Sequence, residues 1–389
     1  MAGPDVSADA TADVTGEELP LAGIRVLELA QMVAGPSAGL LLADYGADVI
    51  KVEPPQGDGG RQLRSLAAAG LPDSPVFVGY NRDKRLIRLD LRSAEGRAKV
   101  LDLVDQADVV IEAARPGAME RLGLGADELL ARNPRLVYAS VSGFGRGPVG
   151  RTRGGVDIVV QAESGIISTT GYPDRPGTKI GFTAVDAACG HTLCHGILAA
   201  LFRRERSGRG DVVRVSLYDV GLHLQTGPLT EYLMTGVQTP RAGNSAPLTA
   251  PADLLRCADG EIIVSAYLDP HWRAFTRTLG APELVDDPRF ADGVLRARHR
   301  AELVELLEKR LAAGTVAEWV ARLSAVGVLV AEVKDYAGVV ADPLAAESGL
   351  LRRVGPDHGV ASPVRLEHTR ERELRPRREL QADDVRFGS

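Results

Sequence analysis

The chain has 389 residues, of which 44% are hydrophobic and 25% are charged, and its formal net charge is −6. These values are typical of a globular protein, and the spread of Lys and Arg along the chain argues against a nucleic-acid partner. Three cysteines are too few for a disulfide framework and favour a reducing compartment. The N-terminus lacks a signal-peptide pattern, and no apolar run nears the roughly 20 residues of a membrane span, so we expect a cytoplasmic protein with no membrane partner.

The first elements predicted along the chain form a strand–helix–strand unit. Residues 1–20 are acidic and small and lack aromatic side chains, which predicts a disordered tail. A strand is expected over 24–29, a short helix over 37–45 with Pro36 in its first turn, and a second strand over 48–53. This succession within a short segment indicates a βαβ unit and therefore a parallel sheet.

The same alternation continues to about residue 225. Ser93 should cap a helix that runs to about Gln106, because its hydroxyl can accept from a backbone amide. The other elements expected here are an extended segment over 85–90, strands over 108–112, 136–142 and 211–217, and short helices near Met119 and over 127–132. This pattern predicts a doubly wound, Rossmann-like α/β domain over residues 21–225.

A second, smaller α+β domain is expected after it, since a chain of this length is long for one core. Gly, Pro and Thr dominate residues 226–251, which predicts a long connection. A strand over 261–266 and helices over 272–279, 300–311 and 316–325 follow from the apolar spacing, and 328–333 begins the return. We therefore expect a linker and small domain over 226–330 and a return segment over 331–389 that packs on the large domain.

Asp186 stands where a loop is expected to become a helix, and small and apolar residues follow it as far as Leu201. An Asp there can cap the helix, and the helix dipole would lower its pKa and keep it ionised. A capping role alone would explain the pattern. A carboxylate can also be a nucleophile that attacks an activated carbonyl where backbone donors can hold the oxyanion. Asp157, which follows the Gly-rich loop 143–155, would then be a supporting group.

Two nearby motifs invite other chemistry but do not support it. The loop 143–150 is similar to a dinucleotide fingerprint, yet Pro148 and residues 151–155 are poor helix sequence, so we expect a wall of a ligand site and no nicotinamide cofactor. His191 and His195 would share one face of a helix, but no second pair of ligands accompanies them, so we expect no metal.

Many short motifs occur in order from about Leu21 to Leu351, and each alone is weak. They are residues 26–29, 34–36, 46–54, 81–85, 89–91, 107–112, 115–117, 121–124, 142–145, 161–162, 196–201, 207–210, 241–244 and 258–260. In this order and at this spacing, the chain resembles the class III coenzyme A transferases. This CaiB/BaiF family includes formyl-CoA transferase and alpha-methylacyl-CoA racemase.

The resemblance implies a ring-shaped subunit with a Rossmann-like large domain, a smaller domain and an interlocked homodimer. It also implies an enzyme that moves coenzyme A from an acyl-CoA to a free carboxylic acid, with no tightly bound cofactor. Asp186 matches the family's catalytic Asp, which attacks the thioester, forms a mixed anhydride and then becomes an aspartyl-CoA thioester. Asp157 matches a helper carboxylate of the formyl-CoA enzyme.

The resemblance further implies a set of contacts for coenzyme A. The arginines among them suit its phosphates, because a guanidinium binds phosphate bidentately. The contacts are Val33, Ala34, Leu89, Asp90, Leu91, Arg92, Ala113, Ala114, Arg115, Arg121, Arg153, Gly154, Gly155 and Val156, with Gly243 and Asn244 in a substrate loop.

The chain also departs from its relatives at several of these positions. Val156 stands where the racemases have His, which removes one of the two groups that proton exchange at an α-carbon needs. Val33 replaces a Gln of the formyl-CoA enzymes, residues 243–247 replace their glycine-rich loop, and Ala113-Ala114 replace Asn-Phe or Asn-Tyr. These departures disfavour formyl-CoA and oxalate and predict a roomier CoA pocket. An acyl-CoA racemase or isomerase, or a CoA-binding protein without turnover, are the alternatives.

Overall fold

The computed structural model describes residues 19–369, 372–381 and 385–388, so the predicted tail lies outside the described residues except for Leu19 and Pro20. The described chain divides into two compact units. The first comprises the described residues of Met1–Val156, Val185–Val220 and Ala346–Ser389, and the second comprises Asp157–Ala184 and Gly221–Ala345. The first unit is therefore assembled from separate stretches of the chain.

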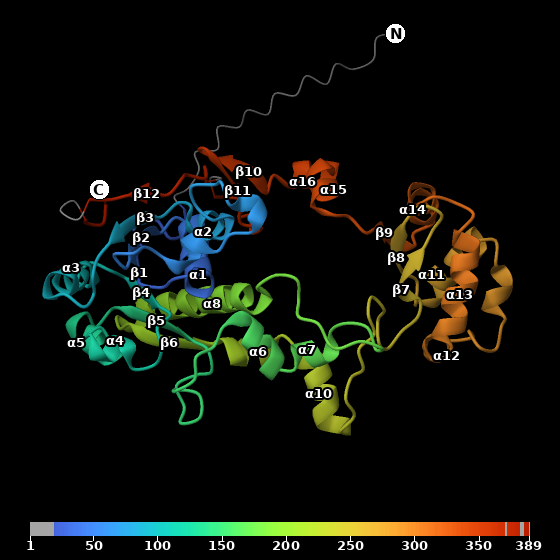
Figure 1. Ribbon diagram of the computed structural model, residues 1–389, viewed down its shortest axis with the longest axis horizontal. Helices are drawn as coiled ribbons and strands as arrows, with labels where there is room; N and C mark the ends of the chain where they lie inside the picture. Colours follow the sequence, from blue (N-terminus) through green and yellow to red (C-terminus); the bar gives the residue numbers. More distant parts are fainter. Residues whose placement is uncertain (1–18, 370–371, 382–384, 389) are drawn as a thin grey trace, which may run out of the picture. The chain divides into compact units, whose positions relative to one another are not determined.

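The first unit is built on a sheet that has seven strands in the described residues, and every neighbouring pair is parallel (Figure 1). Its inner strands are buried along almost their whole length, as expected when helices cover both faces. In spatial order the strands are β12 (Arg378–Glu379), β3 (Arg85–Arg88), β2 (Asp48–Glu53), β1 (Arg25–Glu28), β4 (Val109–Glu112), β5 (Val137–Ser142) and β6 (Asp211–Ser216). The parallel α/β sheet predicted from the sequence is confirmed.

One face of the sheet carries the helices that follow β3 and β4. These are α3 (Ala94–Val104), α4 (Ala118–Arg121) and α5 (Ala126–Arg132), and they share an apolar core with the strands. The predicted cap of α3 is confirmed, because the Ser93 Oγ accepts a hydrogen bond from the amide of Gly96 at 2.9 Å.

The opposite face carries α1 (Ala34–Asp44) and α8 (Ala184–Ser207). Val212 of β6 packs toward the core of the first face, whereas Gly196 of α8 lies against the next residue, Val213. Because successive side chains of a strand point to opposite faces, α8 covers the second face. Its length and composition would suffice for a membrane span, which was not expected from the sequence. Within this unit the helix is buried in part, at Leu193 and Ile197 among others, whereas Phe202 is exposed.

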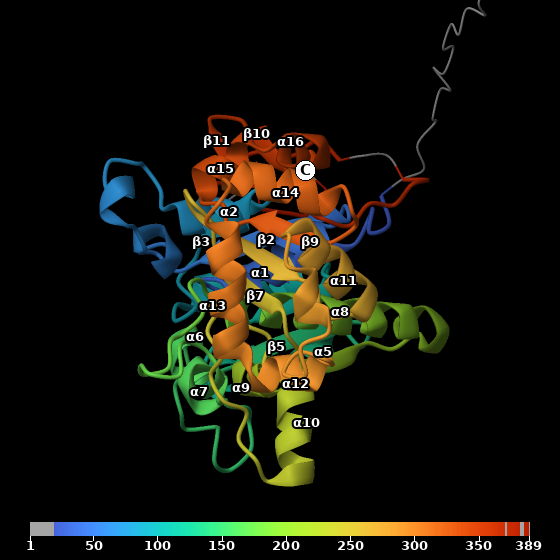
Figure 2. The ribbon, with the colours of Figure 1, turned by 90° about the vertical axis from the view of Figure 1, so that its right-hand side faces the viewer.

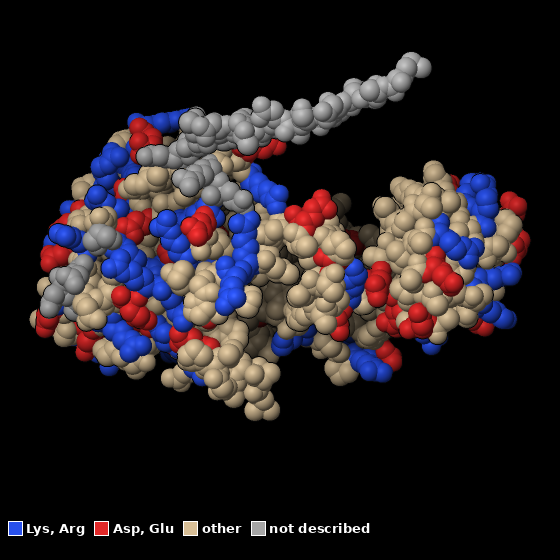
Figure 3. Space-filling model, turned by 90° about the horizontal axis from the view of Figure 1, so that it is seen from above, with Lys and Arg blue, Asp and Glu red and all other residues tan. Residues whose placement is uncertain are grey.

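The rest of the first unit packs around the sheet. It contains α2 (Pro75–Asn81), the short 3-10 helices η1 (Gly59–Gln62) and η2 (Leu66–Ala68), and most of α9 (Leu217–His223). A hairpin of β10 (Leu351–Val354) and β11 (Asp357–Val360) precedes β12. On the face of this unit drawn in Figure 3, Lys and Arg are interspersed with Asp and Glu, unlike the continuous basic field of a nucleic-acid-binding surface.

The second unit has its own core around an antiparallel sheet, which has three strands in the described residues. The strands are β7 (Ala252–Arg256), β8 (Glu261–Ser265) and β9 (Leu329–Glu332). The helices that pack around them are α11 (Asp269–Thr278), η3 (Pro282–Val285), α12 (Gly293–Arg298), α13 (Arg300–Leu311) and α14 (Val316–Ser324). Figure 2 shows α13 beside β7, where Trp272, Phe275 and Leu307 form part of the core.

Several helices of the second unit lie outside that core. They are α6 (Asp157–Glu163), α7 (Ile166–Thr169), α10 (Thr226–Thr235), α15 (Tyr336–Ala341) and the first half of α16 (Pro343–Ser348). The expectation of an unpatterned connection over 226–251 was wrong for its first part, because α10 is a regular helix. None of its residues is buried. The helix therefore lacks a core-facing apolar stripe of the kind that predicts a helix from the sequence.

Candidate active site

The strand order reverses between β1 and β4 in the first unit. From β1 the chain builds outward through β2 and β3, and it then returns to place β4, β5 and β6 on the other side of β1. In an open parallel sheet, such a reversal leaves a crevice outside the carboxyl ends of the strands, where ligands bind. We therefore expect a ligand-binding site among the segments that follow β1, β2, β3 and β4.

A cavity of about 380 Å³ lies at this edge of the sheet. Residues that follow β1 (Gln31, Met32), β2 (Pro54–Gln56) and β3 (Leu89–Arg92) line it, together with Ala113 and Ala114 after β4. The structure thus brings the predicted contacts Leu89, Asp90, Leu91, Arg92, Ala113 and Ala114 into one cavity. The Asp90 carboxylate accepts a hydrogen bond from the backbone amide of Arg92 at 2.9 Å, which ties the turn after β3 to itself.

The predicted contacts Arg115 and Gly154 lie together at the end of β4. A Cβ atom on Gly154 would lie 3.2 Å from Nη2 of Arg115, so the loop before α6 passes directly over this guanidinium. The backbone of Gly155 contacts Gly143 in the same way, and Arg153 stacks on the Phe144 ring at 3.9 Å. The Gly-rich loop therefore folds back onto the end of β5 and carries residues 153–155 toward β4.

The remaining contacts predicted in the first unit differ in exposure. Val33 and Ala34 are buried at the start of α1, whereas Arg121 in α4 and Val156 are exposed. Arg92, Arg115 and Arg153 are exposed as well. An exposed guanidinium can reach a phosphate without first losing its hydration, which suits a role in ligand binding.

Asp186 lies in the first turn of α8, and the prediction that it caps the helix was wrong. The helix begins earlier, at Ala184, because Ala184 and Val185 already take helical conformation. A first-turn carboxylate still faces the positive end of the helix dipole, so the electrostatic part of the argument holds. Asp186 is half-buried, which leaves it accessible.

Close packing between α8 and α1 positions this turn of α8. A Cβ atom on Gly190 would lie 2.9 Å from the carbonyl oxygen of Ala34. Residues four apart share one face of a helix, so Asp186 projects from the turn that precedes this contact. Burial, aided by the Asp186 charge, raises the pKa of the neighbouring Cys189 thiol to about 12, which keeps it protonated and poorly nucleophilic at neutral pH.

Asp157 begins α6 in the second unit and is 6% exposed. Its Oδ2 accepts a hydrogen bond from Nε2 of Gln161, whose Oε1 accepts from the amide of Ile180 at 2.8 Å. The predicted substrate loop lies in the same unit. Its Gly243 donates to the carbonyl of Gly171 at 2.9 Å, and the Asn244 amide group donates to the Tyr172 hydroxyl at 3.4 Å.

A buried network of charges beneath the cavity was missed by the sequence analysis. Glu28 lies between Lys51 (2.9 Å) and Lys84 (2.8 Å), and Lys51 also pairs with Asp58 (2.8 Å). All four residues are at most 1% exposed. Lys51 could have been noticed, because it interrupts an otherwise apolar stretch of a strand that should be buried on both faces.

The network shifts the pKa values of its members. Burial alone would raise the pKa of Glu28, but the two ammonium groups outweigh it and lower that pKa. Burial lowers the pKa of Lys84 to about 8, against the attraction of Glu28. Lys84 is therefore the member whose charge is held least firmly near neutral pH.

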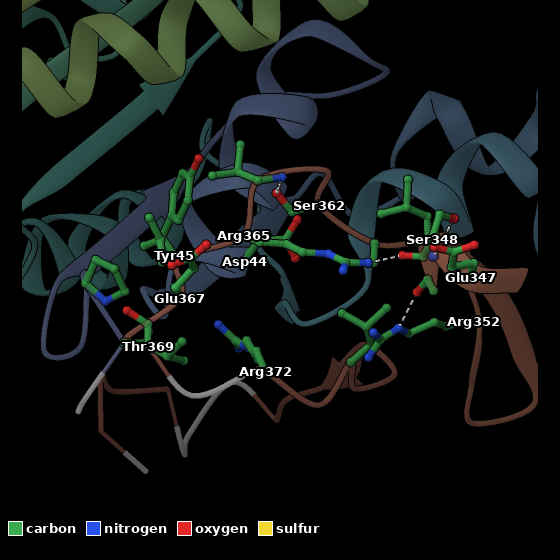
Figure 4. A pocket seen from close by; sticks show the side chains of 18 residues that line it. Asp44, Tyr45, Glu347, Ser348, Arg352, Ser362, Arg365, Glu367, Thr369 and Arg372 are labelled. Carbon is green, nitrogen blue, oxygen red and sulfur yellow. Dashed lines mark hydrogen bonds between the residues drawn. The ribbon is translucent and has the colours of Figure 1, made fainter. Parts of the chain in front are cut away.

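A larger cavity of about 510 Å³ lies at the other end of the sheet (Figure 4). Asp44 and Tyr45 at the end of α1 line it, with Arg352, Arg365 and Arg372 from the C-terminal segment. None of the predicted site residues is among its described lining residues. Ligands of parallel α/β sheets bind at the carboxyl ends of the strands, so the smaller cavity is the stronger candidate for the active site.

No group of three or more His, Cys, Asp or Glu side chains in the described part of the chain is arranged to hold a metal ion. His191 and His195, which the sequence puts on one helical face, are both exposed on α8.

Residues 21–383 match the model of CoA-transferase family III. The chain belongs to this family, and it is a class III CoA transferase. A relative from Mycobacterium tuberculosis named "Probable fatty acyl-CoA transferase Rv3272" is 43% identical over 349 residues, which cover 86% of this chain and 88% of the relative. The succinyl-CoA–D-citramalate CoA-transferase of Chloroflexus aurantiacus is 42% identical over 291 residues, which cover 74% of this transferase and 72% of that one.

Solved structures of the family share the fold of this transferase. A CAIB/BAIF family protein from Brucella suis superposes with a TM-score of 0.83 at 36% sequence identity, over 92% of this chain and 95% of that one. The resemblance to the class III CoA transferases stated from the sequence is therefore confirmed, as is the large parallel sheet of a mixed α/β fold.

Proposed function

We propose that this transferase moves coenzyme A from an acyl-CoA to a free carboxylic acid, with Asp186 as the covalent nucleophile. The observation that carries the proposal is the position of Asp186 in the first turn of α8, one turn before Gly190 packs on the start of α1. The helix dipole favours an ionised carboxylate in a first turn, and an ionised carboxylate is the form that attacks. The raised pKa of Cys189 makes that neighbouring thiol a poor competitor.

In the first half-reaction, a carboxylate oxygen of Asp186 attacks the thioester carbon of the donor. The carbon–sulfur bond breaks, which leaves a mixed anhydride and the CoA thiolate. The thiolate then attacks the aspartyl carbonyl carbon, the carbon–oxygen bond to the acyl group breaks, and the donor acid leaves as a carboxylate. The enzyme now holds an aspartyl-CoA thioester, which keeps the energy of the original thioester.

The second half-reaction runs the same steps backward with the acceptor. The acceptor carboxylate attacks the aspartyl thioester and displaces the CoA thiolate, which forms a new mixed anhydride. The thiolate attacks the acceptor's carbonyl carbon, which releases the new acyl-CoA and regenerates the Asp186 carboxylate. No net proton or electron is exchanged, so these steps need no redox cofactor.

We assign coenzyme A to the cavity at the carboxyl ends of β1–β4. The coenzyme A molecule would lie along Leu89–Arg92 and Ala113–Ala114. The exposed guanidiniums of Arg115, Arg121 and Arg153 would bind its phosphates. The contact between Arg115 and Gly154 supports this assignment, because it brings the Gly-rich loop to the same edge of the sheet. Val33 and Ala34 would contribute backbone groups at the start of α1.

The other residues predicted from the family resemblance keep the roles that it implies. Asp157 would act as the helper carboxylate, held by Gln161, and the loop at Gly243 and Asn244 would contact the acyl group. The acceptor is a carboxylic acid, in keeping with relatives named for succinyl-CoA and D-citramalate or for acetyl-CoA and oxalate. A cytoplasmic location is part of the same proposal and rests on the cysteine content of the chain.

We also propose an interlocked homodimer. Helix α10 supports it, because Tyr232, Leu233 and Met234 are respectively 46%, 75% and 81% exposed and no residue of α10 is buried within the described chain. Large apolar side chains gathered on one exposed helix mark a surface that another protein covers. A second copy of the chain is the partner that the family resemblance implies.

The decisive experiment is to trap the aspartyl thioester. Wild-type enzyme incubated with an acyl-CoA and hydroxylamine should lose activity and carry a hydroxamate on the peptide that contains Asp186, read by mass spectrometry. Asp186→Asn should form no adduct and lose at least about 10³-fold in turnover. Asp127→Asn is the matched control, because Asp127 is also a first-turn carboxylate of a helix in the same unit.

The outcomes separate the alternatives. Full transferase activity in Asp186→Asn would rule out the proposed mechanism. Exchange of substrate α-protons with heavy water, without transfer of coenzyme A, would favour a racemase or isomerase despite Val156. Binding of coenzyme A without either reaction, across a panel of acyl-CoA donors and mono- and dicarboxylates, would favour a binding protein.

A further inference from the structure

Asp58, the carboxylate of the buried charge network that pairs with Lys51, stands in the loop that follows β2 and is 1% exposed. Its Oδ1 accepts hydrogen bonds from the amides of Met32 (3.1 Å) and Gly60 (2.7 Å). Its Oδ2 lies 2.8 Å from Nζ of Lys51, and its own amide donates to Oε2 of Glu53 at 3.0 Å. Asp58 thus joins the loop after β2 to the segment between β1 and α1.

Met32 has a backbone φ of 71°, in the left-handed region that side-chain-bearing residues rarely adopt. Such a conformation persists only where the surrounding structure holds it, and it gathers at functional sites. The hydrogen bond from the Met32 amide to Asp58 helps to hold Met32 in this conformation. Met32 and Gln31 line the cavity at the carboxyl ends of the strands, and Val33 and Ala34 follow them.

Two buried ammonium groups bind the segment 30–36 on both sides of Met32. Lys51 donates to the carbonyl of Ala30 at 2.7 Å, and Lys84 donates to the carbonyl of Pro36 at 2.8 Å. Residues 30–36 are therefore fixed at both ends by ammonium groups and near the middle by Asp58. Because buried charges are costly to leave unpaired, each contact depends on the others.

We propose that Asp58 is a positioning residue for coenzyme A: it holds Met32 in the left-handed conformation and thereby fixes the wall of the cavity formed by residues 30–36. The inference rests on the proposed function, which assigns coenzyme A to this cavity. Asp58 is not among the described residues that line the cavity, so it acts through Met32 and not by contact with the ligand.

The test separates strain at Met32 from general loss of stability. Asp58→Ala should raise the Kd for coenzyme A, measured by isothermal titration calorimetry on the full-length protein, on the order of tenfold. A glycine adopts the left-handed conformation freely, so Asp58→Ala combined with Met32→Gly should bind coenzyme A about as well as Met32→Gly alone. Asp58→Ala combined with Met32→Ala should show no such recovery, because alanine keeps the strain.

Two further variants control for folding. Asp58→Asn keeps an oxygen that accepts from Met32 but loses the charge opposite Lys51, so its Kd should rise less, and it provides a reading if Asp58→Ala does not fold. Asp108→Asn is the matched structural control: Asp108 also accepts a backbone amide (Arg25, 2.9 Å) and pairs with a buried cation (Arg204, 2.8 Å), but at the amino ends of the strands. It should lower the melting temperature without changing the Kd.

The possible results distinguish two failures. If wild-type protein binds coenzyme A and Asp58→Ala binds it with an unchanged Kd, the role of Asp58 is wrong while the proposed function stands. Equal recovery by Met32→Ala and Met32→Gly would also contradict that role. If the wild-type protein binds no coenzyme A at all, the proposed function fails and this role of Asp58 fails with it.

Discussion

Gly190 of α8 packs directly against Ser37 of α1. A Cβ atom on Gly190 would lie 2.4 Å from the Cβ of Ser37. Real Cβ atoms do not approach so closely, so the two helices hold this spacing only while residue 190 has no side chain. Since Asp186 lies one helical turn earlier, the same contact fixes how far the proposed nucleophile stands from the start of α1.

Gly190→Ala should therefore impair turnover without touching Asp186. The added methyl group must push α8 away from α1, at a cost of about 1–3 kcal/mol in the free energy of unfolding. A displacement of even about 1 Å at the nucleophile can reduce turnover on the order of 100-fold. Urea unfolding and steady-state kinetics measure the two effects. The matched control is Gly79→Ala, a helical glycine in α2 with open space around its Cβ, which should leave turnover unchanged.

Asp157→Asn should slow turnover by about 10–100-fold and leave the hydroxylamine-trapped adduct on Asp186 intact. The substitution removes a charge that Gln161 helps to hold but does not remove the nucleophile. Rapid-quench mass spectrometry of the intermediate checks this against steady-state rates. Loss of the adduct together with turnover would show that Asp157 is needed for the first attack.

Arg115→Ala should raise KM for the acyl-CoA about tenfold while kcat and the KM for the acceptor acid change little, because a phosphate contact binds ground state and transition state alike. Arg115→Lys should recover only part of the loss, since an ammonium cannot bind phosphate bidentately. Arg132→Ala, which removes an exposed guanidinium paired with Asp105 in the same unit, is the control. An equal effect in both variants would contradict a specific phosphate contact.

Glu28 should make the transferase sensitive to acid. The pKa of Glu28 is lowered in the folded state, so the unfolded chain takes up a proton first as the pH falls. The free energy of unfolding therefore declines below about pH 4.5, until the pH passes the folded pKa. Glu28→Gln should be about 3–5 kcal/mol less stable at pH 7, because it leaves Lys51 and Lys84 without their shared carboxylate. Its stability should also fall less steeply between pH 5 and 4. Urea midpoints of both proteins across this range make the comparison, and parallel curves would contradict the prediction.

The proposed interlocked homodimer should not exchange subunits. Tagged and untagged native dimers, mixed and incubated, should yield no mixed dimer by native mass spectrometry, whereas the same mixture unfolded and refolded together should yield about half. Exchange between native dimers without unfolding would exclude interlocking.

The sequence predicted the elements that local patterns define. The strand over 48–53 and the helix over 300–311 match β2 and α13 residue for residue, because their apolar spacing and the turns that bound them are local. The start of α8 was misplaced, since an Asp followed by small residues suits either a cap or a first turn. Helix α10 was missed, because Gly227 and Pro228 in its first turn are typical of a loop even though a helix tolerates Pro there.

The candidate site was predictable only in part. The segments that follow strands could be named from the sequence, and the structure gathers Leu89–Arg92 and Ala113–Ala114 around one cavity, although their role in binding coenzyme A stays a prediction. The charge network could not be found in this way. Glu28 meets Lys84 only because β1, β2 and β3 are neighbours in the sheet, and no local pattern of residues carries that long-range pairing.

The outermost described strand, β12, has a consequence for how the protein is made. It pairs with β3, and nearby Arg61 binds Glu379, 318 residues further along the chain. At about 5–20 residues per second of synthesis, the newly made β3 waits on the order of tens of seconds for that partner. During this interval its free edge is open to strands of other nascent chains, whereas the second unit, which ends at Ala345, is wholly synthesised before β12. A ribosome that stalls between Ala345 and Arg378 should therefore leave chains that aggregate through the first unit.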